Sequence, residues 1–148
     1  MKVWLSKKLL RILAKEVEEK FPKETGGILV GYISNSDYVI THIIGPGPQA
    51  VHTADKFIPD HDFQCEEIAK HYKHTEGSET YLGDWHSHPN APAYLSNQDK
   101  STFRKIAQFK EAKISKPIMM ILGTEPQEIK CWRYVHRYRF QIQEVICY

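Results

Sequence analysis

Apolar residues recur at helical spacing in three parts of the chain, with polar residues between them. In the first part, Ser6 is suited to be an N-cap and Pro22 ends the pattern, which predicts a helix between them. Its apolar stripe consists of Leu9, Leu10, Leu13, Val17 and Phe21. A second helix is expected to begin at Asp60 or His61, and a third at Ser96.

The second and third helices each place apolar side chains on one face. Those of the second are Cys65, Ile68, Ala69 and Tyr72, and those of the third are Phe103, Ile106 and Ala107. An apolar helix face normally packs against the core. Cys65 is therefore expected to be buried, whereas His71 and His74 are expected to be solvated rather than to bind a ligand.

Short apolar runs between the helices predict strands. They cover residues 28–30, 38–44, 81–85, 117–122 and 129–135. Gly and Pro residues make 45–53 an expected loop, and residues 138–145 fit either a strand or a helix. No linker, internal repeat or low-complexity tract interrupts this order. The sequence therefore predicts one domain over residues 1–148, an α/β or α+β sandwich.

Composition and charge narrow the classes of partner. The formal net charge of the 148 residues is +2 and no basic stripe stands out, so we expect no nucleic-acid partner. No apolar run approaches the ~18 residues of a membrane span, so we expect no membrane partner. Cys65, Cys131 and Cys147 form no CxxC pair, and the N-terminus lacks the pattern of a secretory leader. These features favour reduced thiols and a cytoplasmic location.

Two histidines and one aspartate have the spacing of a metal site. His86 and His88 lie two residues apart at the end of a predicted strand, so their imidazoles point to the same face. Asp99 lies in the first turn of the next helix, within reach of a short connection. Three protein ligands leave one position of a tetrahedral zinc site open for water, which is typical of a catalytic rather than a structural site. The predicted cofactor is Zn²⁺.

Hydrolysis at such a site needs a group that moves protons and a donor for the developing oxyanion. Glu24, just before the Gly26-Gly27 entry into a strand, is the candidate acid/base, and Ser96 is the candidate donor. Each also has a local explanation. Ser96-x-x-Asp99 fits a helix capping box, and Glu24 fits a solvated carboxylate at a helix end. Asp84 is a candidate partner for a histidine ring, and Trp85 is expected in the core.

Taken together, these motifs resemble the signature of the JAMM (JAB/MPN+) zinc metallopeptidases. The family has a distant Glu, then His-x-His-Pro, then Ser-x-x-Asp, with ten residues between the second His and the Asp. The chain carries these motifs as His86-Ser87-His88-Pro89 and Ser96-Asn97-Gln98-Asp99, with Glu24-Thr25-Gly26-Gly27 upstream.

The resemblance covers roughly residues 3–135 and implies a JAB/MPN-like, cytidine-deaminase-like sandwich, in which helices flank a central mixed β-sheet. It also implies that His86, His88 and Asp99 bind zinc, that Glu24 is the acid/base and that Ser96 stabilises the oxyanion. Because no position of the motif is missing, the chain differs from inactive MPN scaffolds.

The same resemblance implies cleavage after the C-terminal glycine of a ubiquitin-like protein or its conjugate. Residues 45–54 and 90–95 are the expected walls for its Gly-Gly tail. The chain is most similar to compact prokaryotic JAB proteins, including CBASS antiviral proteases that release a conjugated nucleotidyltransferase. Processing of a sulfur-carrier protein is an alternative. A RadC-like role in DNA repair and a non-catalytic MPN binding module are further alternatives.

Overall fold

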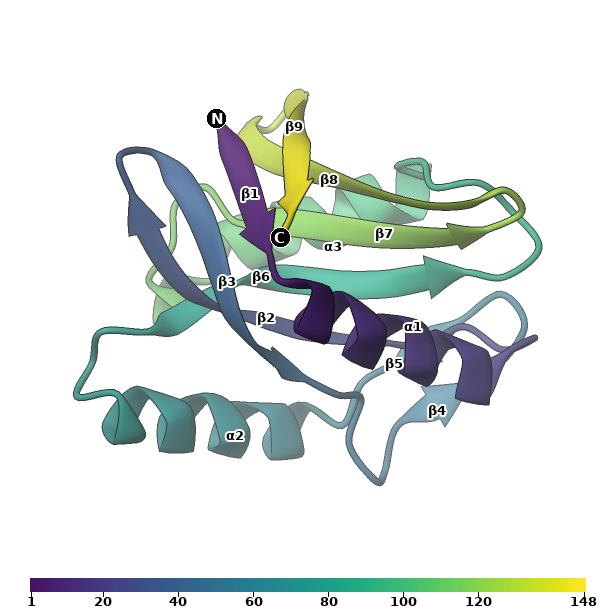
Figure 1. The fold of residues 1–148 in the computed structure, drawn as a ribbon, viewed down its shortest axis with the longest axis horizontal. Helices are drawn as coiled ribbons and strands as arrows, with labels where there is room; N and C mark the ends of the chain where they lie inside the picture. Colours follow the sequence, from purple (N-terminus) through teal and green to yellow (C-terminus); the bar gives the residue numbers. More distant parts are fainter.

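The computed structural model describes residues 1–148 and contains a closed seven-stranded barrel in the order β1-β3-β2-β6-β7-β8-β9 (Figure 1). The strands of the barrel are β1 (Lys2–Leu5), β2 (Gly26–Ser34), β3 (Asp37–Ile44), β6 (Thr80–His88), β7 (Ile118–Thr124), β8 (Gln127–His136) and β9 (Arg139–Cys147). A separate hairpin pairs β4 (Val51–His52) with β5 (Phe57–Ile58). The helices are α1 (Lys7–Lys20), α2 (His61–His74) and α3 (Asn97–Gln108), followed by a 3₁₀ turn (Lys110–Ala112).

The sheet is mixed and has helices on both faces. β1 runs parallel to β3 and β9, and β6 runs parallel to β7, whereas the other neighbours are antiparallel. Leu9 and Leu13 of α1 join the main core cluster with β-strand residues. Phe103 of α3 belongs to a second, smaller cluster, and Phe63 of α2 packs against a third. This arrangement confirms the expected α+β class with a central mixed sheet flanked by helices.

Alternate residues of β7 show how the sheet is covered. Met120 belongs to the cluster shared with α1, whereas Met119 and Ile121 belong to the cluster shared with α3. Successive strand side chains point to opposite faces, so a strand covered on both sides is apolar throughout. Trp85 of β6 is buried in the main cluster as expected.

Several local predictions need correction or completion. Cys65 is exposed, because α2 is turned so that its neighbour Gln64 is buried and donates from Nε2 to Gly45 O at 3.1 Å. His71 is not simply solvated, since its Nε2 lies 2.7 Å from Glu79 Oε1 and its ring stacks on His42. Of the segment 138–145, residues 139–145 belong to the strand β9 and Tyr138 lies in the turn before it, and the expected loop at 45–53 contains β4.

The N-terminal strand β1 was not predicted and closes the barrel. It pairs with β3 on one side and with β9 on the other, so the first and last strands of the chain lie side by side (Figure 1). Val3 and Leu5 point into the core and are fully buried.

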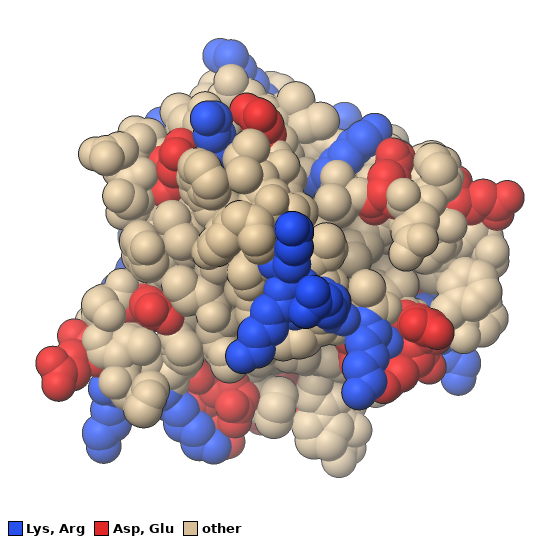
Figure 2. All heavy atoms as spheres, viewed as in Figure 1, with Lys and Arg blue, Asp and Glu red and all other residues tan.

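The surface seen in the same view carries basic side chains near its middle, where α1 begins, with acidic side chains on both sides (Figure 2). None of the helices is both long enough and apolar enough to cross a membrane.

Candidate metal centre

Strand β6 delivers the two histidines of the candidate site. It lies between β2 and β7, and its C-terminal end carries His86 and His88 on one face. Their Nε2 atoms lie 3.2 Å apart. Ser87 between them points to the opposite side and is fully buried. The period of two that defines a strand therefore produces the paired imidazoles.

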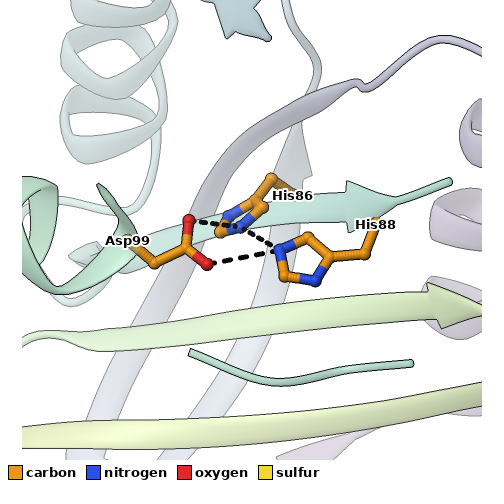
Figure 3. Close-up of side chains that lie close together, drawn as sticks. All are labelled: His86, His88 and Asp99. Carbon is orange, nitrogen blue, oxygen red and sulfur yellow. Dashed lines mark hydrogen bonds and ion pairs between the residues drawn. The ribbon is translucent and has the colours of Figure 1, made fainter. Parts of the chain in front are cut away.

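Helix α3 brings Asp99 to the same point (Figure 3). Asp99 Oδ1 lies 3.0 Å from His86 Nε2, and Oδ2 lies 3.2 Å from His88 Nε2. Asp99 also completes a capping box, in which its Oδ2 accepts from Ser96 N and its own N–H donates to Ser96 Oγ, both at 3.0 Å. The helix cap and the contact with the histidines therefore coexist, and the cap fixes the carboxylate.

The three side chains fit a divalent metal ion. Ligand atoms about 2.0–2.1 Å from a tetrahedral zinc lie about 3.3 Å from one another, close to the 3.0–3.2 Å separations seen among these three residues. The His88 Nδ1 atom lies 3.2 Å from Pro92 O. A proton on Nδ1, donated to that carbonyl, leaves the Nε2 lone pair free to bind a metal. The candidate ligand atoms of His86, His88 and Asp99 all lie within 4.8 Å of one another.

A pocket of about 340 Å³ contains this triad. Glu24 and Ser96 line it together with the three candidate ligands, so the structure brings all five residues selected from the sequence into one pocket. One wall comes from the β4–β5 region, and another comes from the loop before α3. Their lining residues are Ala54, Asp55, Phe57, Pro59, Ala91 and Tyr94.

Comparisons with known proteins decide the family. The model of the Prok-JAB family, prokaryotic homologs of the JAB domain, matches residues 6–135. This chain belongs to the Prok-JAB family. It is 34% identical over 127 residues to a "probable metalloprotease y4qB" of Sinorhizobium fredii (strain NBRC 101917 / NGR234), a match that covers 84% of this chain and 77% of that protein.

The fold of this Prok-JAB protein also resembles a solved structure. The solution structure of protein DSY2949 from Desulfitobacterium hafniense superposes with a TM-score of 0.75. The match covers 100% of this chain and 93% of the other, at 20% sequence identity. At that identity, the comparison supports the fold alone.

The electrostatics of the Prok-JAB centre reflect its burial and its close pairs. Burial raises the pKa of Glu24, although His86 and His88 oppose this effect. Burial also disfavours the charge of Asp99, but hydrogen bonds from the two histidines outweigh it and hold its pKa well below the usual range. For His88, burial lowers the pKa, and the contacts with Asp99 more than compensate and raise it. A carboxylate with a raised pKa is suited to exchange protons.

Asp84, the candidate partner for a histidine ring, forms no hydrogen bond with a histidine, although the nearby His86 partly offsets the effect of burial on its pKa. The Asp84 carboxylate accepts a short hydrogen bond from the hydroxyl of Tyr81 instead. Asp84 still lines the pocket, and burial raises its pKa to about 6.

Two residues near Glu24 were missed as contributors to the site. His52 Nδ1 lies 2.9 Å from the Glu24 carbonyl oxygen, and Ser87 Oγ accepts from Thr25 N at 3.0 Å. For Ser87 the strand period was an available signal, since a residue between two same-face histidines must point inward. No sequence spacing connects His52 with Glu24.

Proposed function

We propose that the chain is a zinc-dependent peptidase that hydrolyses the peptide or isopeptide bond after the C-terminal glycine of a ubiquitin-like protein. The observation that carries the proposal is the convergence of His86, His88 and Asp99 in one pocket with Glu24. Membership of the Prok-JAB family and the similarity to a probable metalloprotease support a metallopeptidase-like function.

Each residue has a role that follows from its chemistry. His86, His88 and Asp99 would hold the zinc. The ion would supply a Lewis acid and activate a water molecule. Glu24 would accept the proton of that water and pass it to the leaving amine. Burial raises the pKa of Glu24, which suits it to this transfer. The Ser96 oxygen accepts from Asp99 N, which leaves its own O–H free to donate to the oxyanion.

The pocket suits a narrow, extended chain terminus. Residues around Ala54 and Phe57 form one side, and Ala91 and Tyr94 form the other. A Gly-Gly tail has no side chains to clash with such walls, and an extended tail can pair with a strand edge. Replacing residues 45–54 or residues 90–95 by Gly/Ser segments should therefore raise KM, and unchanged cleavage kinetics would refute this assignment.

We propose a role in reversing ubiquitin-like conjugation in the cytoplasm, for example the release of a nucleotidyltransferase in antiviral defence. This role depends on cleavage of an isopeptide bond. Processing of a sulfur-carrier precursor would instead require cleavage of a linear peptide bond. Both substrate types present the same glycine tail, so they are distinguished by whether the bond after the last glycine is an isopeptide bond or a linear peptide bond.

The proposal is tested first by metal content and turnover. Zinc per chain should be about one for the wild type and for Glu24→Gln, and close to none for His88→Ala. Glu24→Gln should lower turnover by about 10²–10⁴-fold, the usual contribution of a general acid/base. The exposed His74 gives the matched control His74→Ala, which should retain zinc and activity.

Substrates are a ubiquitin-like protein joined to a lysine peptide by an isopeptide bond and the same protein as a linear fusion. The proposed zinc peptidase would be refuted if the protein bound no zinc, or if the Glu24→Gln variant were as active as the wild type. A protein that binds zinc without any turnover would be the binding module.

A further inference from the structure

The segment that carries Glu24 has no regular secondary structure. Residues 21–25 connect α1 to β2, outside both elements. A loop residue keeps a fixed position only if other elements hold its backbone. The contacts of Glu24 and its neighbours therefore decide where the candidate acid/base lies.

Both backbone polar groups of Glu24 are bound to the β4 region. Glu24 N donates to Thr53 O at 2.7 Å. His52 Nδ1 lies 2.9 Å from Glu24 O. A carbonyl oxygen only accepts, so His52 must carry a proton on Nδ1 and donate it. Residues 52 and 53 thus hold the peptide groups on both sides of the Glu24 side chain.

The hairpin that contributes these contacts is itself packed against the start of β2. His52 pairs with Phe57 across the hairpin, and their ring centroids lie 5.4 Å apart. The Phe57 ring lies directly on Gly26, where an added Cβ would be 2.7 Å from Phe57 Cε2. Phe57 also lines the pocket, together with Ala54 and Asp55. One small hairpin therefore serves as a pocket wall and as the support of Glu24.

We propose that His52 is a positioning residue for Glu24, and that through it the β4–β5 hairpin couples occupation of the pocket to the placement of the acid/base. A substrate tail lying against the hairpin fixes residues 52–57. The bonds from His52 and Thr53 then fix the Glu24 backbone. The catalytic half of this inference rests on the proposed function, whereas the structural link between His52 and Glu24 does not.

Substitutions at His52 separate its hydrogen bond from its bulk. His52→Ala removes the donor. His52→Asn keeps an amide N–H near the place of Nδ1, whereas His52→Gln moves the donor toward the place of Nε2. We expect His52→Ala and His52→Gln to lower kcat by about fivefold to tenfold or more, as for loss of one hydrogen bond. His52→Asn should restore most of kcat, and zinc content should stay at the wild-type value throughout.

The ratio of kcat to KM effects distinguishes positioning from a general loss of structure. A positioning role changes kcat more than KM at unchanged zinc content. In the Glu24→Gln background, His52→Ala should have no further effect on residual turnover, because the group it positions is already absent. Independent, multiplicative effects of the two substitutions would overturn the proposal.

Amide hydrogen exchange tests the link without any substrate. The Glu24 amide should exchange about fivefold to tenfold faster in His52→Ala than in the wild type, and near the wild-type rate in His52→Asn. His74→Ala is the control. Unchanged exchange at Glu24 in folded His52→Ala, or in His52→Gln if the Ala variant does not fold, would overturn the proposal. Equal activity of Glu24→Gln and the wild type would instead refute the proposed function, while exchange still decides the structural link.

Discussion

Replacing the buried Ser87 by Ala should destabilise the protein, and the cost follows from its contacts. Ser87 and Thr25 are both 0% exposed, and Ser87 Oγ accepts from Thr25 N at 3.0 Å. The substitution leaves that N–H buried without its acceptor, which costs about 1–3 kcal/mol. The main-chain bond from Ser87 N to Thr25 O, 2.9 Å long, remains. The fold should therefore survive with a lower free energy of unfolding.

Urea unfolding of the metal-free protein measures this cost directly. For a chain of this length, a loss of about 1–3 kcal/mol corresponds to a fall in Tm of about 2–12 °C. The exposed Ser101 of α3 offers the matched control Ser101→Ala, expected within about 0.5 kcal/mol of the wild type. Because Thr25 follows Glu24, Ser87→Ala should also lower turnover while zinc content is unchanged. A free energy of unfolding for Ser87→Ala equal to that of Ser101→Ala would refute the reasoning.

Three further predictions address the site, the packing and the pH response. Zinc at about 1,000 times its dissociation constant should add about 4 kcal/mol of stability, so chelation should lower the Tm of the wild type but not that of His88→Ala. Gly26→Ala should lower the free energy of unfolding in urea by about 1–3 kcal/mol, because the added Cβ would lie 2.5 Å from Trp85 O. The control Gly45→Ala places its Cβ in open space. Equal stabilities of the two variants would refute the close packing at Gly26. The hydrogen bond from Thr41, and then the contact with His71, lower the pKa of Glu79 from 4.5. A carboxyl group whose pKa is lower in the folded than in the unfolded protein stabilises the fold at pH values above the unfolded pKa, and this stabilisation is lost as the solution becomes more acidic. The stability of Glu79→Gln should therefore fall less than that of the wild type as the pH drops below about 4.5. Parallel curves of stability against pH would contradict this.

The helices and most strands were predictable because their signals are local. The stripe that begins at Leu9 and the alternation around His86 depend on residues a few positions apart. β1, β4 and β5 were missed because they are short and gain stability from distant partners. β1, for example, pairs with residues 37–44 and 139–147. Cys65 was misplaced because the rotation of α2 is set by the surface that it packs on, which favours burial of Gln64.

The candidate ligands show the same division. Sequence alone gave a shared face for His86 and His88 and a capping role for Asp99, since both follow from the geometry of one strand and one helix turn. Only the tertiary structure decided that the carboxylate oxygens of Asp99 lie 3.0–3.2 Å from the Nε2 atoms of His86 and His88. It also decided that Asp84 pairs with Tyr81 rather than with a histidine.

For the acid/base, the sequence nominated Glu24 from its place before the double glycine, but it said nothing about what holds it there. His52, Thr53 and Ser87 bind its segment from 28 or more residues away along the chain. Periodicity fixes the direction of side chains within one element. The packing of elements that are distant in sequence fixes which of those side chains share a pocket, because their contacts form only when the barrel closes.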